Sequence, residues 1–240
     1  MKRLLIAIFV ALLIPAAAVA DLHGAWTMTE GEDGWLYLHF MTGQWNNWGH
    51  SMMPMDLGID KATIHATTVT PVKFELRREA GTISFEGTFK LGDGAGQFYF
   101  TPNPNFASAI RGLGIEDDLQ VDRSDDEKLL SLALADVTVA YARSIKALFP
   151  AVTFREVRRA RGTNVTPDYV AQMRAAGVNF GTAREAARLK ELNVTPKYIS
   201  DLAAAGYKNL SYDQLRRLAT HGITAEFIRR MSNTTRKDQP

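Results

Sequence analysis

The chain has 240 residues, of which 46% are hydrophobic and 22% are charged, and its formal net charge at pH 7 is +2. It contains no cysteine, which excludes disulfides, thiolate metal sites and the attachment of a lipid to a cysteine. The length allows two modest domains.

Residues 1–20 are predicted to be a secretory signal. Lys2 and Arg3 give a basic start, residues 4–14 are apolar but too few to span a bilayer, and Pro15 ends the apolar run. Small residues at 18–20 precede the expected cleavage site. Cleavage after Ala20 is favoured, and cleavage after Ala18 is the alternative.

The predicted location is therefore the periplasm, or the medium for a secreted protein. An exported chain without cysteine fits a Gram-negative periplasm better than a eukaryotic secretory route, where small domains depend on disulfides. No second run of about 20 apolar residues follows the signal, so no transmembrane segment is expected in the mature chain.

Charge divides the chain into an acidic and a basic half. Residues 21–136 hold 8 Lys and Arg against 18 Asp and Glu, a net charge of −10, whereas residues 137–240 hold 18 against 8, a net charge of +10. A basic half often indicates nucleic acid binding, but export argues against that partner. Anionic lipid head groups, an acidic partner or the acidic half of the same chain are the remaining candidates.

The predicted fold class is α+β with two domains, and residues 21–115 form the first, an antiparallel β domain. Apolar and polar residues alternate over 72–76, 83–89 and 98–100, with glycine-containing turns between them. Period-two alternation over such short runs is typical of half-buried strands.

The flanking segments extend this β domain. Residues 24–29 and 35–41 are expected to form another hairpin, and one more strand is expected near 62–69. A meander of about five to seven strands predicts a small barrel or sandwich. A short helix over 106–113 and an acidic linker over 116–123 follow.

Residues 124–232 are predicted to form an array of helical repeats with a period of 29 residues, a solenoid, before a disordered tail at 233–240. One series of helix starts is a Ser or Thr with Glu or Gln three residues later, which is the capping box. Its members are Ser124 with Glu127, Thr153 with Glu156, Thr182 with Glu185 and Ser211 with Gln214.

A second series of helix starts lies between these boxes. Each member begins with Val or Ile, followed by Thr as N-cap, and has an aromatic residue at the fifth position. Two members have Pro at the first helical position. The segments are 137–141, 165–169, 194–198 and 223–227.

The second series also predicts a buried face and the ends of helices. The residues eight positions after each first Val or Ile are expected to be buried: Ile145, Met173, Leu202 and Met231. Left-handed turns that close helices are expected at Asn164, Asn193, Gly222, Gly177 and Gly206.

This pattern resembles two-helix repeats in extracytoplasmic regions of bacterial envelope proteins, some of which follow the membrane metalloprotease domain of β-lactam-sensor-like proteins. The resemblance rests on residues 165–169, 194–198 and 223–227, and on the β segment 74–100. It implies a sensing or docking role. The chain has no His-Glu-x-x-His motif, so the resemblance does not extend to protease activity.

Arginines on the predicted helices are the candidate partner-binding residues. They would form a basic stripe for an acidic protein partner or for the chain's own β domain, and the alternative is an ordinary solvated face. They are Arg158, Arg159, Arg188, Arg216, Arg217, Arg229 and Arg230.

A glycan site on the β domain is one alternative function. Trp45, Asn46 and Trp48 would supply aromatic faces for sugar rings and an amide for hydroxyl groups. Trp26 and Trp35 are instead expected in the core.

Copper binding is the other alternative. His23 would be the third residue of the mature chain, where a free amine, two backbone amides and an imidazole can bind Cu(II) in a square plane. A nearby segment offers thioether and imidazole ligands, although its methionines equally suit an irregular core loop. These residues are His50, Met52, Met53 and Met55.

The sequence favours a noncatalytic binding or scaffold protein. The remaining histidines fall in no ligand spacing, and neither a glycine-rich phosphate loop nor a nucleophile elbow is present. We therefore expect no enzymatic activity and no cofactor, and we expect the helical repeats to dock a protein partner in the cell envelope.

Overall fold

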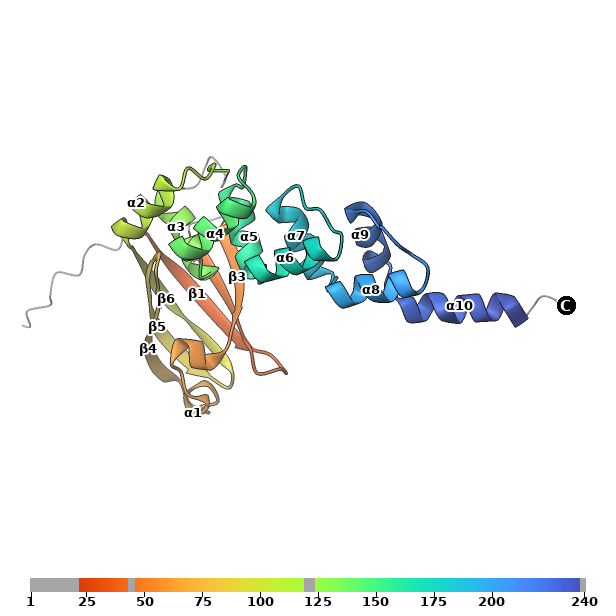
Figure 1. Ribbon diagram of the computed structural model, residues 1–240. Helices are drawn as coiled ribbons and strands as arrows, with labels where there is room; N and C mark the ends of the chain where they lie inside the picture. The colour runs from red at the N-terminus through yellow and green to blue at the C-terminus, as the bar shows by residue number, and fades with distance from the viewer. Residues whose placement is uncertain (1–21, 43–45, 119–123, 238–240) are drawn as a thin grey trace, which may run out of the picture. The chain divides into compact units, whose positions relative to one another are not determined.

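The computed structural model describes residues 22–42, 46–118 and 124–237 (Figure 1). The predicted signal, the C-terminal residues from 238 and most of the acidic linker lie outside these residues. The contacts between Cα atoms divide the chain into two compact units. We call them the sheet unit, Met1–Phe74 with Ile83–Thr101, and the helical unit, Glu75–Thr82 with Pro102–Pro240.

The strands form one curled, six-stranded antiparallel sheet in the order β3-β2-β1-β6-β5-β4. The predicted antiparallel β fold is confirmed, as a half-barrel rather than a closed barrel or a two-sheet sandwich. The strands are β1 (Leu22–Glu30), β2 (Leu36–Thr42), β3 (Asn46–Met52), β4 (Thr70–Arg78), β5 (Gly81–Lys90) and β6 (Asp93–Pro102).

The segment before β4 differs from the sequence prediction. The strand expected near 62–69 is wrong, since the helix α1 (Lys61–Ile64) begins there, after the short 3-10 helix η1 (Pro54–Leu57). Asp60 caps α1, because its carboxylate accepts a hydrogen bond from the backbone N–H of Thr63 at 2.6 Å. The strand β3, in turn, was not expected from the sequence.

Trp26 lies at the centre of the core of the sheet unit. It is fully buried, and Phe40 on β2 and Gly96 on β6 are its cross-strand neighbours. Its indole N–H donates to the carbonyl oxygen of Gln97 at 3.0 Å. Gly96 has to be glycine, because a Cβ atom there would lie 2.0 Å from the carbonyl oxygen of Glu86.

The helices of the helical unit alternate between the two kinds of predicted helix start. In Figure 1 they run from α2 to α10 along the green and blue part of the chain. They are α2 (Pro104–Gly112), α3 (Asp125–Leu134), α4 (Val139–Leu148), α5 (Phe154–Gly162), α6 (Pro167–Ala175), α7 (Ala183–Glu191), α8 (Pro196–Ala204), α9 (Tyr212–Thr220) and α10 (Ala225–Lys237).

The predicted helix starts are confirmed. Ser124, Thr153 and Ser211 form capping boxes in which both hydrogen bonds are made. Thr182 accepts the bond from the N–H of Glu185, but the carboxylate of Glu185 accepts from the N–H of Gly181, one residue earlier than predicted. The threonines before α4, α6 and α8 also act as N-caps.

The predicted left-handed positions are confirmed as well. The φ angles of Asn164 and Asn193 are 55° and 56°, and those of Gly177, Gly206 and Gly222 are 90°, 97° and 64°. A residue with positive φ at the end of a helix reverses the chain and lets the last carbonyls find donors. These turns fix where each helix ends.

The helices pack in two rows. In one row α5 packs against α7 and α7 against α9, and these helices begin with a Ser or Thr of the first series of helix starts. In the other row α4 packs against α6 and α8 against α10. Within the described residues, no helix is both long enough and apolar enough to cross a membrane.

The buried face follows the prediction until α10. Ile145, Met173 and Leu202 are fully buried, whereas Met231 is 55% exposed. The prediction for Met231 is therefore wrong. Met231 occupies the same place in the sequence pattern as the three buried residues. Burial, however, also requires a neighbouring element that covers the side chain.

Candidate partner-binding surface

A tyrosine hydroxyl links successive helix pairs at three places. Tyr141 donates to the carbonyl oxygen of Val165 at 2.8 Å, and Tyr169 to that of Val194 at 3.2 Å. Tyr198 makes the same bond to Ile223 at 2.7 Å. In each case the acceptor lies 24 or 25 residues later and is the Val or Ile that begins the next segment of the second series.

These hydroxyl groups remain protonated donors at physiological pH. Burial raises the pKa of Tyr141 and of Tyr169 above the ordinary value of 10.0, because desolvation disfavours the phenolate. Burial also raises the pKa of Tyr198. The three bonds therefore do not depend on pH in the physiological range.

A cation lies over two of these rings. The guanidinium carbon of Arg161 lies 5.6 Å from the ring centroid of Tyr141, and the ammonium nitrogen of Lys190 lies 4.5 Å from that of Tyr169. Lys190 follows Arg161 by 29 residues, so the contact has the period of the sequence. Two of the basic residues thus stabilise packing by cation–π attraction.

Arg159 and Arg188, two of the predicted partner-binding arginines, lie at one acidic side chain. Arg159 on α5 donates twice to the carboxylate of Glu191 on α7, at 2.8 and 2.7 Å, and Arg188 donates to it at 3.3 Å. The hydrogen bond from Arg159 holds the pKa of Glu191 below its usual value. Arg159 therefore links α5 to α7, whereas Arg188 lies on α7 itself, three residues before Glu191.

The other predicted arginines lie on α5, α9 and α10. Arg158 is half-buried on α5, and Arg216 forms an ion pair with Asp213 at 3.4 Å. Arg217 is exposed on α9, and its Nε donates to the backbone oxygen of Asp213 at 3.4 Å. Arg229 and Arg230 are both exposed on α10. The seven arginines thus do not form one uniform stripe.

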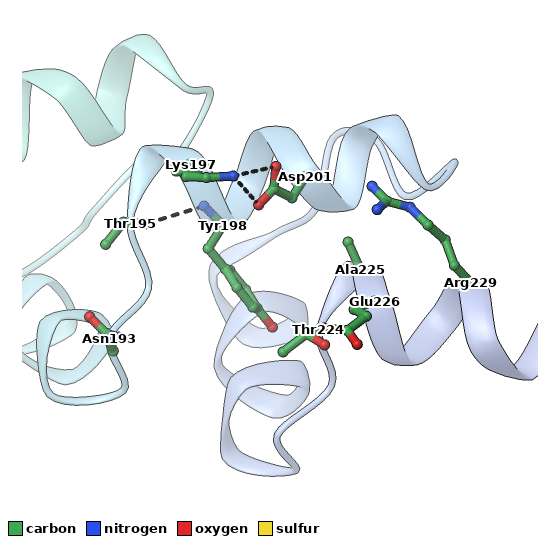
Figure 2. Close-up of a pocket in the computed structure, with 9 residues that line it drawn as sticks. All are labelled: Asn193, Thr195, Lys197, Tyr198, Asp201, Thr224, Ala225, Glu226 and Arg229. Atoms are coloured by element: carbon green, nitrogen blue, oxygen red, sulfur yellow. Dashed lines mark hydrogen bonds and ion pairs between the residues drawn. The ribbon is translucent and has the colours of Figure 1, made fainter.

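A polar cavity of about 410 Å³ lies between α8 and α10 (Figure 2). Lys197 and Asp201 pair on α8 at 2.7 Å, Tyr198 reaches toward Thr224, and Arg229 rises from α10. Groups of both charges beside hydroxyls suit hydrogen bonding to a polar chain segment. The lining residues are Asn193, Thr195, Lys197, Tyr198, Asp201, Thr224, Ala225, Glu226 and Arg229.

Sequence reasoning identified only Arg229 among the charged residues of this cavity. Lys197 and Asp201 are four residues apart, which is a signal that they share a helix face. Nothing local in the sequence indicates that Glu226, on the next helix of the row, shares their cavity.

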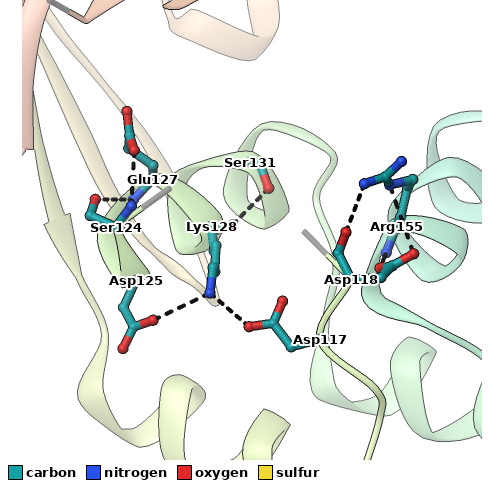
Figure 3. Close-up of polar contacts among 8 residues, drawn as sticks. All are labelled: Asp117, Asp118, Ser124, Asp125, Glu127, Lys128, Ser131 and Arg155. Atoms are coloured by element: carbon teal, nitrogen blue, oxygen red, sulfur yellow. Dashed lines mark hydrogen bonds and ion pairs between the residues drawn. The ribbon is translucent and has the colours of Figure 1, made fainter. Parts of the chain in front are cut away.

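The first residues of the acidic linker are bound to helices of the helical unit (Figure 3). Lys128 on α3 forms ion pairs with Asp117 at 2.7 Å and with Asp125 at 3.7 Å. The hydrogen bond to Asp117 raises the pKa of Lys128. Asp118 accepts from the backbone N–H of Arg155 at 2.9 Å. These acidic side chains contact α3 and α5, and they are not a separate anionic site.

The glycan residues of the prediction fall outside the described side chains. Trp45 lies outside the described residues, and only the backbone of Asn46 and Trp48 is placed, on β3 opposite Thr42 and Phe40. Trp26 is buried as predicted, but Trp35, also expected in the core, is 39% exposed. That prediction for Trp35 is wrong.

Other aromatic side chains are exposed on the sheet unit. Tyr37 on β2 is 41% exposed and Tyr99 on β6 is 40% exposed. His23 stacks on Tyr99 with their ring centroids 6.4 Å apart. These tyrosines could not be selected from the sequence, because period-two alternation indicates which residues face outward but not which of them bind a ligand.

The residues of the copper hypothesis lie apart. His50 on β3 pairs with Leu38 on β2, and Leu38 pairs with Met28 on β1. His50 therefore lies two strands away from β1, level with Met28, which follows His23 by five residues. Five residues of strand span roughly 16 Å. Met52 is buried at 3% exposure, Met53 is half-buried and Met55 is 78% exposed. The structure does not bring His23 to the methionine segment.

Among the described residues, no group of three or more His, Asp or Glu side chains is arranged to bind a metal ion. Comparisons with protein-family models, with curated proteins and with solved structures found no match to this chain. The candidate site is therefore defined by its own geometry: the polar cavity and the exposed arginines of α9 and α10.

Proposed function

We propose that this chain is an exported, noncatalytic binding protein whose helix pairs stack into a repeat array that docks a protein partner in the bacterial envelope. The observation that carries the proposal is the recurring tyrosine contact. A period that is present in the sequence is matched by tertiary contacts at three successive boundaries. Stacked helix pairs of this kind mainly create an extended surface.

The distribution of charge on this surface favours a partner that is an acidic protein. The cavity between α8 and α10 is lined by two basic and two acidic side chains, but Arg217, Arg229 and Arg230 are exposed on α9 and α10 and make this part of the chain basic. Location in the periplasm follows from the predicted signal and from the absence of cysteine. A docking role is also what the resemblance to envelope repeat regions implies.

Affinity capture from native envelope extract tests this proposal. The bait is the full mature chain, and the matched control bait carries Arg229→Glu and Arg230→Glu. The proposal expects one protein to be enriched by the mature chain at least tenfold over the control bait. No enriched protein, or equal enrichment on both baits, would contradict it.

Glycan binding by the sheet unit is a second candidate, and the exposed rings of Tyr37 and Tyr99 favour it. Aromatic faces bind sugar rings through their apolar side. Titration of the chain with soluble peptidoglycan fragments, monitored by intrinsic fluorescence, tests this candidate. A change that Tyr99→Ala removes would support glycan binding, and an unchanged spectrum would rule these rings out as its site.

A further inference from the structure

The outward face of α9 and α10 differs from every earlier boundary of the helical unit. We define this terminal face by Arg217, Leu218, Ile223, Phe227 and Met231. Leu218 and Ile223 are half-buried, whereas Leu189 and Val194, which lie one period of 29 residues earlier, are fully buried. Phe227 is 38% exposed, whereas Tyr169 is 6% exposed and Tyr141 and Tyr198 are half-buried.

The earlier boundaries show what kind of element covers such a face. At the boundary after α5 and α6, the helix α7 packs against α5, and its Ala186 is fully buried. The same helix presents Glu191 to Arg159. An amphipathic helix with an apolar stripe and a carboxylate at its edge therefore fits this kind of face.

Arg217 lies 58 residues after Arg159 and occupies the same place in the sequence pattern. Within the described part of the chain, it has no carboxylate partner of the kind that Glu191 provides to Arg159. Among the described residues, no acidic side chain forms an ion pair with Arg217. The segment from Tyr212 to Lys237 contains six basic and two acidic residues, a net charge of +4. This charge disfavours a second copy of the same face and favours an acidic occupant.

Phe227 indicates that the occupant is not another identical helix pair. The residues at the three equivalent earlier positions are tyrosines. The hydroxyl of each one donates to the backbone carbonyl oxygen of the Val or Ile that begins the next helix pair. Phenylalanine has no hydroxyl, so it makes no such bond. An apolar ring at this place fits an apolar side chain of a partner.

We propose that the terminal face binds an acidic amphipathic helix of the protein partner, with Arg217 pairing with a carboxylate and with Phe227 and Met231 contacting the apolar stripe of that helix. This inference rests on the proposed docking function and specifies where the partner binds. The described length of α10, 13 residues, matches a partner helix of about three to four turns.

Binding of synthetic helices to the full mature chain tests the inference. The probe is a labelled peptide of about 20 residues with leucine at helical spacing and glutamate on its flanks, and its twin carries lysine in place of glutamate. Fluorescence anisotropy should show binding of the acidic peptide at least tenfold tighter than of its twin. Arg217→Glu and Phe227→Ser should each weaken that binding at least tenfold.

The matched control is Arg143→Glu, which reverses an exposed arginine on α4 and changes the net charge equally. It should change the affinity less than twofold, and Arg217→Lys should retain part of the binding. Circular dichroism establishes that each variant is folded. If Phe227→Ser is unfolded, Phe227→Leu replaces it, and Arg217→Glu alone still decides the role of charge.

Four results would overturn the inference. They are equal binding of both peptides, an equal effect of Arg143→Glu, binding only to vesicles that contain anionic phosphatidylglycerol, and a dimer in sedimentation that Phe227→Ser abolishes. The capture experiment separates the two proposals. A partner that is still captured by the Arg217→Glu chain would leave the docking function standing and remove the terminal face as its site.

Discussion

At the scale of single residues, the hydroxyl of Tyr169 lies in a buried place and donates to the carbonyl oxygen of Val194. Tyr169→Phe removes the donor and leaves that carbonyl without its partner. We expect the free energy of unfolding to fall by about 1–2 kcal/mol, measured by urea denaturation. The control Tyr99→Phe removes an exposed hydroxyl and should change stability by less than about 0.5 kcal/mol. Equal effects of the two substitutions would contradict the structural role of the Tyr169 bond.

The pair of Arg159 and Glu191 predicts a dependence of stability on pH. The pKa of Glu191 in the folded protein lies below its usual value of 4.5, mainly because Arg159 donates to the carboxylate. The stabilisation is therefore complete above the unfolded-state pKa and is lost as the pH falls through the lower folded-state pKa. Because both side chains are partly exposed, the contribution should not exceed about 1 kcal/mol.

Glu191→Gln isolates this contribution. The difference in unfolding free energy between the original chain and the variant should be constant at neutral pH and should shrink at acid pH. Glu226→Gln, which changes an exposed carboxylate on α10, is the control. A difference for Glu191→Gln that grows as the pH falls would contradict the assigned sign.

At the scale of helices and strands, the positive φ of Asn164 at the end of α5 requires a residue that tolerates a left-handed conformation. Asn164→Ala should cost about 1 kcal/mol of stability, whereas Asn164→Gly should be close to neutral. Asn179→Ala, at an exposed asparagine whose φ angle is not positive, is the control. Thermal unfolding of the three variants is the measurement, and an equal loss for Ala and Gly would contradict the conformational explanation.

The helix starts could be predicted from the sequence, whereas β3 and α1 could not, for a physical reason. Helix starts such as Thr166 with Pro167 act within one turn, so a few adjacent residues specify them. The strand β3 was missed because its residues Asn46–Met52 do not alternate, and α1 was missed because the single residue Asp60 sets its start. Elements fixed by pairing with a distant strand leave a weaker local signal.

The candidate site was predicted only in part, since it depends on contacts between helices. Spacing placed Arg159 and Arg217 at equivalent positions, but the sequence does not show that Arg159 finds Glu191. It likewise does not show that Met231 is exposed although Met173 is buried. Pattern predicts which face a side chain occupies, whereas burial and pairing depend on the neighbouring element.

At the scale of the whole molecule, the proposed repeat array predicts that the chain can be lengthened by one period. Inserting a second copy of residues 182–210 between Leu210 and Ser211 adds one complete period of 29 residues. The longer chain should fold cooperatively and gain helical circular dichroism, because nearest-neighbour contacts are repeated. Inserting only residues 182–195 breaks the period and should destabilise the helices after it. Equal tolerance of both insertions would contradict stacking in register.

The central claim is that a protein partner contacts the helical unit, and crosslinking at single sites tests it most directly. A photoreactive amino acid is placed in the full chain at Arg217 or Phe227, at Arg143 as a distant helical position, and at Tyr37 or Tyr99 on the sheet unit. We predict that one envelope protein crosslinks at Arg217 and Phe227, and neither at Arg143 nor at the two tyrosines. Crosslinks to a protein only from Tyr37 and Tyr99 would contradict the account, and they would assign binding to the sheet unit.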